Sequence, residues 1–399
     1  MIGDLSLVRA LGRRGIPVAA AISQPRSPLA WSRYCAATVR TASFVDEPDR
    51  AVADLLSWAR QQAEPPVAFY QGDHDLLALS RHREELAPHL RCVLPPAVLV
   101  EDFVDKLRFA ALAARVLLPT PSTVTLERSE AGPRAAGWKD FPCVLKPAVR
   151  THWFGSPLLS DCGNQKAVFI RDREELERLL PLVALHETDV ILQAAIAGGE
   201  ERIVSYHAYV RPGGEVVAEF SGKKVRTAPR TYGLSTYVEI TDDPEVKRLG
   251  RSVLERLEFS GVAKLDFKRS ADDDRLYLLE INPRFNLWHH PGTLAGVCLP
   301  ELVYRDCLEP GSARANGPAR GGVRWIAPRE DLRAFDEYRA AGEVSRLGWL
   351  REVLAADINE DLCLRDPMPG LFELAGIAQR RLARVLRRGE RSATASVAG

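Results

Sequence analysis

Residues 261–284, GVAKLDFKRSADDDRLYLLEINPR, predict two short apolar strands joined by a polar turn. The first strand carries Asp266, the second carries Glu280, and Asn282 and Arg284 follow directly. Asp266, Glu280 and Asn282 offer only oxygen ligands, with no His or Cys among them. Such a set suits a hard cation such as Mg²⁺, which proteins hold with one or two carboxylates plus substrate phosphates.

The alternative for this stretch is an ordinary hairpin whose acids are solvated. The ending Glu-x-Asn-Pro-Arg, placed where an apolar strand stops, favours the metal site over that alternative. Arg284 presents a planar fork of donors that can meet phosphate or carboxylate oxygens. We therefore expect it to take part in catalysis.

The sequence LEINPR at 279–284, preceded by a strand acid, resembles the metal-binding end of the ATP-grasp superfamily. Within it, the resemblance is to carboxylate–amine ligases of the D-aspartate ligase group, and it runs from roughly Leu5 to Pro369. It implies an α/β fold of the α+β ATP-grasp type, with ATP and Mg²⁺ bound and Mn²⁺ as an alternative metal. The expected domains are a Rossmann-like domain at 1–100, a two-subdomain ATP-grasp domain at 101–310, a C-terminal helical extension at 311–387 and a disordered tail at 388–399.

Bulk composition excludes several classes of function. The 399 residues contain 54 Lys and Arg against 53 Asp and Glu, so no basic field favours nucleic acid or an anionic membrane. No run of about 18 apolar residues predicts a membrane span. The seven cysteines are scattered and lack C-x-x-C pairs, which indicates reduced thiols. We expect a cytoplasmic enzyme without nucleic-acid or membrane partners.

The first hundred residues alternate helical and strand signals. A helix over 5–14 is closed by Gly15, a strand follows over 17–22, and another over 67–70 ends in Gln71-Gly72-Asp73. The related family has a strand and a glycine turn before Leu5, so we expect a truncated start and an incomplete sheet edge. A Rossmann oxidoreductase is excluded because no G-x-G-x-x-G is present.

Two lysines stand where the resemblance implies contacts with nucleotide phosphates. Lys106 lies early in a helix expected over 101–117, where its ammonium and the helix N-terminus can both face an anion. Lys146 interrupts the apolar strand PCVLKP, a position that is costly unless it faces a cleft or a counter-ion. Lys166 is a weaker third candidate. The alternative for each is a solvated surface lysine.

The loop over 150–165 stands where the family has a glycine-rich flap above the phosphates. It contains only Gly155 and Gly163, and it is made bulky by His152 and its aromatic neighbours. We expect a flap at this position without the usual run of glycines. The role of His152 stays open, since a loop histidine beside aromatic residues more often packs than reacts.

The segment VILQAAIAGGEER, at 190–202, resembles the strand that clamps adenine in the family. The resemblance assigns Gln193, Ala194 and Ile196 to the base and Glu201 to the ribose hydroxyls. Related sequences carry Gln-Glu where this chain has Gln193-Ala194, so backbone carbonyls would replace one side-chain acceptor. A solvated, uncommitted acid is the alternative for Glu201.

Alternation along an extended strand predicts that Lys224 and Arg226 share one face. There they could hold the transferred phosphate or the acceptor carboxylate, and we assign both to catalysis. The alternative is a solvated basic edge strand. His289 and His290 follow the Arg284 segment, and at most one of this tandem pair can be functional.

The leading function is an ATP-dependent carboxylate–amine ligase that forms an amide through an acyl phosphate and releases ADP and phosphate. Two alternatives stay open: an ATP-grasp small-molecule kinase, and a nucleotide-binding module without turnover. The expected partners are a small carboxylate and an amine, with amino acids included, and a homodimer is an open possibility. The sequence names neither substrate.

Overall fold

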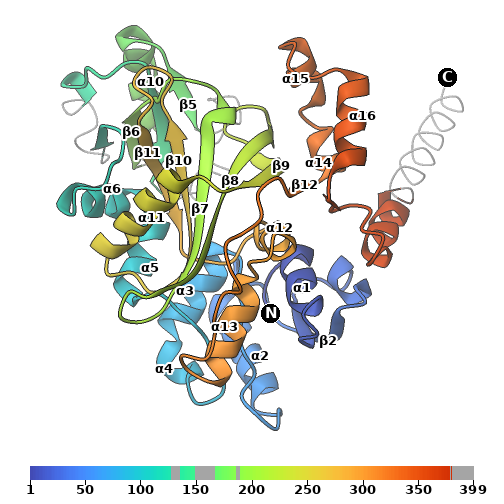
Figure 1. Cartoon of the computed structure of the whole chain (residues 1–399). Helices are drawn as coiled ribbons and strands as arrows, with labels where there is room; N and C mark the ends of the chain where they lie inside the picture. The colour runs from blue at the N-terminus through green and yellow to red at the C-terminus, as the bar shows by residue number, and fades with distance from the viewer. Residues whose placement is uncertain (127–134, 149–166, 186–188, 378, 380–399) are drawn as a thin grey trace, which may run out of the picture.

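The computed structural model describes residues 1–126, 135–148, 167–185, 189–377 and 379 (Figure 1). Lys166, His152 with its loop, and the tail from 388 lie outside these ranges. The strands are β1 Val18–Ile22, β2 Cys35–Arg40, β3 Thr123–Leu126, β4 Cys143–Pro147, β5 Val168–Ile170, β6 Val190–Ala194, β7 Ile203–Val210, β8 Val216–Ala228, β9 Leu234–Thr241, β10 Gly261–Arg269, β11 Leu276–Asn282, β12 Arg324–Ile326 and β13 Ile358–Asn359.

Helices cover these strands and connect them. The α-helices are α1 Leu5–Gly12, α2 Pro48–Ala59, α3 Asp73–Arg81, α4 Arg83–Leu86, α5 Ala97–Val104, α6 Lys106–Arg115, α10 Arg173–Leu185, α11 Pro244–Arg256, α12 His289–Leu294, α13 Leu299–Leu308, α14 Pro328–Asp331, α15 Phe335–Ala340 and α16 Arg346–Ala355. Two 3₁₀ turns, η1 Pro28–Trp31 and η2 Glu200–Arg202, are also present, and residues 368–377 are helical. Among these, no helix combines the length and apolarity needed to cross a bilayer.

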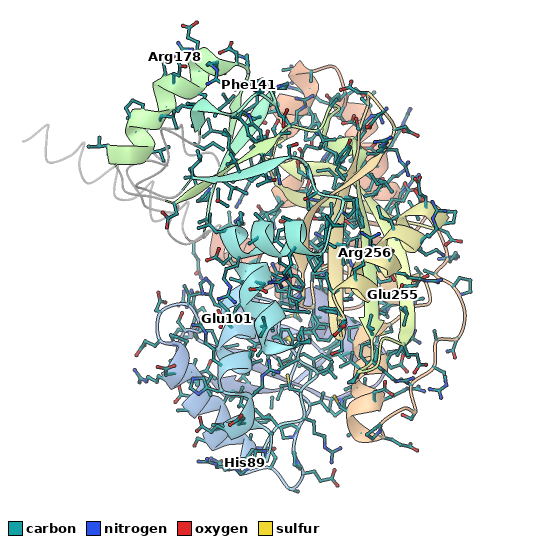
Figure 2. The ribbon with its side chains drawn as sticks, turned by 90° about the vertical axis from the view of Figure 1, so that its left-hand side faces the viewer. His89, Glu101, Phe141, Arg178, Glu255 and Arg256 are labelled. Carbon is teal, nitrogen blue, oxygen red and sulfur yellow. The ribbon has the colours of Figure 1, made fainter. Side chains whose placement is uncertain are left out.

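The large sheet runs in the order β11-β10-β7-β8-β9-β12-β13, and the small sheet in the order β3-β6-β4-β5. Figure 2 shows the two as separate layers, with Phe141 and Arg178 marking the small-sheet layer and His89 the opposite, N-terminal end. The predicted hairpin of β10 and β11 is confirmed, as is the pairing of β7 with β8 around the turn at 211–215. The charged residues singled out in the sequence are thus divided between two sheets.

Strands β1 and β2 pair in parallel and form a small N-terminal sheet. The first two residues extend this sheet through a parallel bridge between Ile2 and Tyr70. The amide of Ala21 donates to the Met1 carbonyl (2.9 Å), and the Ile2 amide donates to the Phe69 carbonyl (2.8 Å). The expectation that the start of the chain forms an incomplete edge of the sheet is therefore wrong. The segment 1–2 lies between β1 and residues 67–70, in the interior of the sheet.

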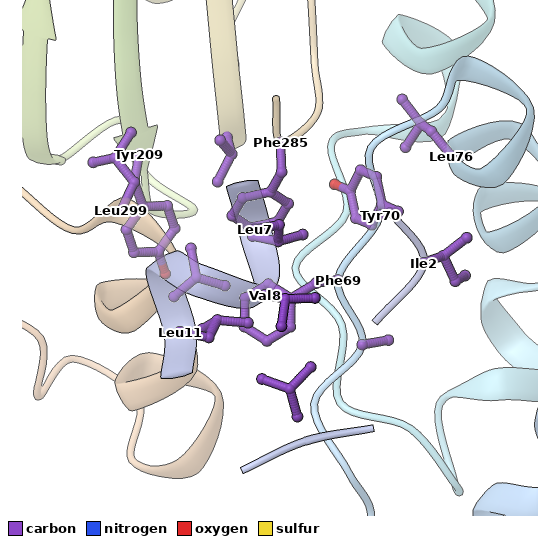
Figure 3. Close-up of a cluster of buried hydrophobic side chains, with 14 of the residues drawn as sticks. Ile2, Leu7, Val8, Leu11, Phe69, Tyr70, Leu76, Tyr209, Phe285 and Leu299 are labelled. Carbon is purple, nitrogen blue, oxygen red and sulfur yellow. The ribbon is translucent and has the colours of Figure 1, made fainter. Parts of the chain in front are cut away.

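Helix α1 packs this N-terminal part against α12 and α13, two helices that follow the β10–β11 hairpin in the chain. The Asp4 side chain caps the helix by accepting the Ser6 amide (2.9 Å), and Leu7, Val8 and Leu11 are buried. Figure 3 shows Leu7, Val8 and Leu11 in one cluster with Phe69 and Tyr70, and with Tyr209, Phe285 and Leu299 from the opposite side. One hydrophobic core therefore extends from the N-terminal segment to β7 and to the chain after β11.

The helix expected over 101–117 is instead two helices, α5 and α6. Asp105 between them is extended (φ −97°, ψ 119°), and its carboxylate accepts the amides of Leu107 and Arg108. An aspartate that caps its own downstream amides competes with helix continuation, which explains the break. Lys106 consequently occupies the first position of a new helix.

The C-terminal region departs from the purely helical extension that we expected. Strand β12 pairs with β9, and β13 pairs with β12, so this region adds two strands to the large sheet. Helices α14, α15 and α16 then stand as a separate layer beyond β9 and β12 (Figure 1). The turn of β8 into β9 lies against this layer.

Candidate active site

A cavity of about 1280 Å³ is lined by both sheets. The large sheet contributes residues of β8, β10 and β11, and the small sheet contributes residues of β4 and β6. The N-terminal segment 71–74 and two residues of the C-terminal region also reach the cavity. Of the candidate site residues in the described ranges, all except Arg226 line this one space.

Cross-strand pairing brings the predicted metal ligands together. Asp266 lies directly opposite Glu280, and a bulge follows at once, because Phe267 pairs with Leu278. Such a bulge re-aims the residue beside it. Glu280 is exposed to solvent and accepts the Asn282 side-chain amide (3.0 Å). The three oxygen-bearing side chains therefore come from adjacent strands and line the same cavity.

Asp266 is almost completely buried and is shared by two lysines. Its carboxylate lies 2.7 Å from the Lys264 ammonium and 3.3 Å from the Lys224 ammonium, and it accepts the Ser205 hydroxyl (2.5 Å). Burial opposes the charge of Asp266, but the two lysines hold its pKa well below the usual range. Burial opposes the charge of Lys224 too, yet Asp266 and Glu280 raise its pKa, whereas burial lowers the pKa of Lys264.

Lys146 has a different environment on the small sheet. Its ammonium donates to the Gln193 amide oxygen (2.8 Å), and the Gln193 amide nitrogen donates to the Thr123 hydroxyl (3.0 Å). Burial lowers the pKa of Lys146 to about 8, and the nearby ammonium of Lys106 contributes in the same direction. Gln193 was assigned to adenine from the sequence, and here it also orients Lys146 in the cavity.

Lys106 lines the cavity, but the helix N-terminus beside it is not an anion site. The amides of Leu107 and Arg108 donate to the Asp105 carboxylate, and the Lys106 amide donates to the Ala148 carbonyl (3.0 Å). These first amides of α6 are therefore engaged within the protein. The helix end is therefore not available to an anion, and a role of Lys106 toward phosphate stays a prediction that concerns its side chain alone.

The segment assigned to the nucleotide base and sugar lies along one wall of the cavity. Gln193, Ala194 and Ile196 line it, followed by Glu200 and Glu201 of η2. Burial raises the pKa of Glu200, although Lys224 and Lys268 oppose this shift. The wall therefore runs from an apolar strand end to a pair of acids, as adenine and ribose contacts would require.

Arg284 is anchored to the N-terminal part of the chain. It forms an ion pair with Asp73, the first residue of α3, and donates to the Asn282 side-chain oxygen (3.0 Å). Both Arg284 and Asp73 line the cavity. The sequence marked Asp73 only as the end of a strand, and nothing in its local pattern indicated this partner.

Arg226 is placed away from the cavity, so the prediction that it shares a face with Lys224 is wrong. The pairing register with β9 shifts between these two residues, which breaks the simple alternation. Arg226 forms ion pairs with Asp331 (2.8 Å) and Glu352 (2.5 Å) of the C-terminal layer. It is a buried link to that layer.

The tandem histidines are buried and do not line the cavity. His289 and His290 both belong to α12, and burial lowers the pKa of His289 to about 3. His290 lies 3.5 Å from the Glu360 carboxylate. Their environment is that of core residues.

Sequence reasoning missed several residues of the cavity. Lys264 and Lys268 lie two residues before and after Asp266 on β10, so strand alternation could have found them. Tyr338 and Glu343 come from the C-terminal region, more than a hundred residues from the strands they approach. No local signal identifies such long-range contacts.

Comparison with known proteins agrees with this geometry. Residues 215–327 match the family described as ATP-grasp in the biosynthetic pathway with Ter operon. The chain is 26% identical over 242 residues to D-aspartate ligase from Enterococcus faecium (strain Aus0004), a match covering 59% of this chain and 57% of that ligase. The chain thus spans little more than half the length of that relative.

Two solved structures are similar over most of the chain. An ADP complex of N5-carboxyaminoimidazole ribonucleotide synthetase has a TM-score of 0.57 at 17% identity, covering 80% of this chain and 77% of that one. The L-amino acid ligase from Bacillus licheniformis has a TM-score of 0.55 at 15% identity, covering 79% and 76%. The chain therefore has the ATP-grasp fold, which confirms the resemblance seen in the sequence.

Proposed function

We propose that this ATP-grasp protein is an ATP-dependent carboxylate–amine ligase that releases ADP and phosphate. The observation that supports this most is the convergence of two features in one cavity. Oxygen ligands from the adjacent strands β10 and β11 line it, and Lys146, which donates to the uncharged amide of Gln193, reaches it from the small sheet. A polyphosphate with a bound cation fits both features, because the cation would bind the oxygen ligands and the phosphate oxygens would accept from Lys146.

The donor set fits Mg²⁺ in its chemistry. Asp266, Glu280 and Asn282 would hold it, and a cation of this kind takes its remaining ligands from water and phosphates. The set contains two carboxylates and one amide, and among the described residues no group of three or more His, Cys, Asp or Glu side chains is placed to hold a metal ion. When bound, the metal would neutralise charge on the phosphate oxygens.

In this proposal the side chains bind, orient and neutralise. Lys106 and Lys146 bind phosphate oxygens, and Glu201 with the end of β6 holds the nucleoside. Lys224 and Arg284 stabilise the negative charge as the terminal phosphoryl group passes to a substrate carboxylate. The bond from that phosphorus to the bridging oxygen breaks as a new one to the carboxylate oxygen forms, which leaves ADP. An amine then attacks the acyl carbon, phosphate departs, and the amine loses a proton.

A hydroxylamine trap tests this proposal. The full chain is incubated with ATP, Mg²⁺ and panels of amino acids and small carboxylates, first without an added amine and then with hydroxylamine. We expect ADP and a hydroxamate derived from the carboxylate that is the substrate. AMP as the nucleotide product would overturn the mechanism. A stable phosphorylated product would favour the kinase alternative, and nucleotide binding without ADP formation would favour the non-catalytic module.

A further inference from the structure

The C-terminal layer contacts the part of β8 that turns into β9, and this turn is a wall of the cavity. The turn comprises residues 229–233, of which Arg230, Thr231, Tyr232 and Gly233 line the cavity. Helices α14–α16 lie beyond residue 327, where the match to the family ends. Their role is therefore not given by that match.

Four contacts hold the turn and the end of β8 just before it from outside. The Thr227 amide donates to the Tyr338 hydroxyl (2.9 Å), and the Arg230 amide donates to the Glu337 carboxylate (3.1 Å). The Arg230 guanidinium forms an ion pair with Glu343 and lies over the Tyr338 ring, 5.8 Å from its centroid. Helix α15 and the residues after it thus engage both the backbone and the side chain of the turn.

The turn itself has a conformation that needs support. Tyr232 has φ +57°, in the left-handed region that residues other than glycine rarely adopt. Inside the turn, the Thr227 hydroxyl lies 2.9 Å from the carbonyl oxygens of both Pro229 and Arg230. Such a backbone persists where the surrounding structure determines it, and here α15 supplies those surroundings.

On its inner side, the turn contacts the acids at the nucleotide wall. The 3₁₀ turn η2, which carries Glu200 and Glu201, packs against β8, and both acids line the cavity together with residues 230–233 of the turn. The 229–233 turn therefore lies between the C-terminal layer on its outer side and the cavity that holds Glu200 and Glu201 on its inner side. Tyr338 and Glu343 also line the cavity themselves.

We propose that the C-terminal layer is part of the nucleotide site, in which Tyr338 and Glu343 act as positioning residues that hold the 229–233 turn against the ribose end. This inference rests on the proposed function only in placing the nucleotide sugar at Glu200 and Glu201. It does not depend on which carboxylate or amine reacts. The expected signature is loss of nucleotide affinity, with folding stability unchanged in the variant that alters only the half-exposed Glu343.

Calorimetric titration of the full chain with ADP and Mg²⁺ tests the proposal. Tyr338→Phe removes the oxygen that accepts the Thr227 amide, and Glu343→Gln removes the charge that pairs with Arg230. Each should raise the dissociation constant for ADP by about 3- to 10-fold, as expected for one positioning hydrogen bond or ion pair. The melting temperature of Glu343→Gln should match that of Glu330→Gln, a control in the same layer whose exposed pair with Arg333 does not reach the cavity.

Glu343 is half-exposed, so Glu343→Gln keeps the test valid if Tyr338→Phe fails to fold. Equal ADP affinities in Glu343→Gln, Glu330→Gln and the wild type would overturn this inference and leave the ligase proposal standing. Weakened ADP binding in a protein that forms no hydroxamate would support it and overturn only the ligase reaction. A wild-type chain that does not bind ADP would overturn both.

Discussion

Lysines enter the cavity from two sheets, and their charges are balanced in different ways. On the large sheet, Lys224 and Lys264 share the buried carboxylate of Asp266. On the small sheet, Lys146 meets the uncharged amide oxygen of Gln193. The pKa of Lys224 is raised, mainly by Asp266 acting against burial, whereas burial lowers the pKa of Lys146 to about 8.

This difference separates two reasons for burying an ammonium group. A lysine beside a carboxylate is neutralised by the protein itself and contributes to the fold. A lysine beside an amide keeps an unfavourable burial energy until an anion arrives. Binding of a phosphate should therefore stabilise the charge of Lys146 on the small sheet more than the charges of the large-sheet lysines. Asp266 already holds Lys224 and Lys264 in place. Four predictions follow from this contrast.

The largest expected effect is on stability. Asp266→Asn leaves the ammonium groups of Lys224 and Lys264 without their shared carboxylate, and such a loss in a buried site costs about 3–5 kcal/mol. Urea unfolding followed by circular dichroism measures this. Asp272→Asn, in the exposed turn of the same hairpin, is the control. An unfolding free energy equal to that of the control would show that the lysines do not depend on Asp266.

Glu280→Gln should abolish turnover and leave the fold intact. Glu280 raises the pKa of Lys146 and also of both large-sheet lysines, so its charge acts on both groups. The amide keeps the volume and removes a charge assigned to the metal, and we expect at least about a 100-fold fall in kcat, the scale seen for preorganised electrostatic groups. ADP release and the melting temperature are measured together. Near-wild-type activity would refute the metal assignment.

Lys146→Met should weaken ATP binding by about 10- to 100-fold, because a charge-assisted hydrogen bond to phosphate is lost. Its unfolding free energy should not fall, since the variant also removes a buried charge. Lys223→Met serves as control, because Lys223 is half-exposed on β8, lies 3.6 Å from Glu239 and does not line the cavity. Lys166→Ala, outside the described residues, should also have the smaller effect. Equal ATP affinities of the Lys146 and Lys223 variants would show that Lys146 has no special role in binding phosphate.

The smallest effect is a pH dependence. The Lys146 ammonium is present below about pH 8 and lost above it, so ADP affinity should fall by about fivefold between pH 7 and 9. Stability has the opposite sign: between pH 8 and the ordinary pKa of 10.5, the unfolded chain binds more protons, so this group adds stability as pH rises. In Lys146→Met the affinity change should vanish. A pH profile unaltered by that substitution would assign the titration to another group.

The sequence predicted the β10–β11 hairpin because both strands are apolar runs of the right length around a polar turn. It predicted Lys146 because a cation inside an apolar strand has few structural explanations. Both inferences use local information. They depend on residues next to one another, and the structure confirms the hairpin and brings Lys146 into the cavity.

Local reasoning failed where one residue changed the geometry. A shift of register between Lys224 and Arg226 removed Arg226 from the cavity, and Asp105 divided an expected helix into two. The contacts of Tyr338 with β8 could not be predicted, because α15 is separated from that strand by more than a hundred residues. Strand bulges, helix breaks and contacts between distant segments depend on tertiary structure. The periodicity of apolar residues in strands and helices does not contain that information.

The break at Asp105 also has a mechanical meaning. Helix α5 contacts β11 of the large sheet, whereas α6 contacts β3 and β6 of the small sheet. Both helices also pack into the core of the large sheet, through Phe103 of α5 and Leu112 of α6. The two backbone dihedrals of Asp105 therefore set the direction in which α6 leaves α5 toward the small sheet. A substitution that lets residues 97–115 run as one straight helix would move Lys106 and the other cavity-lining side chains of α6 without replacing any of them.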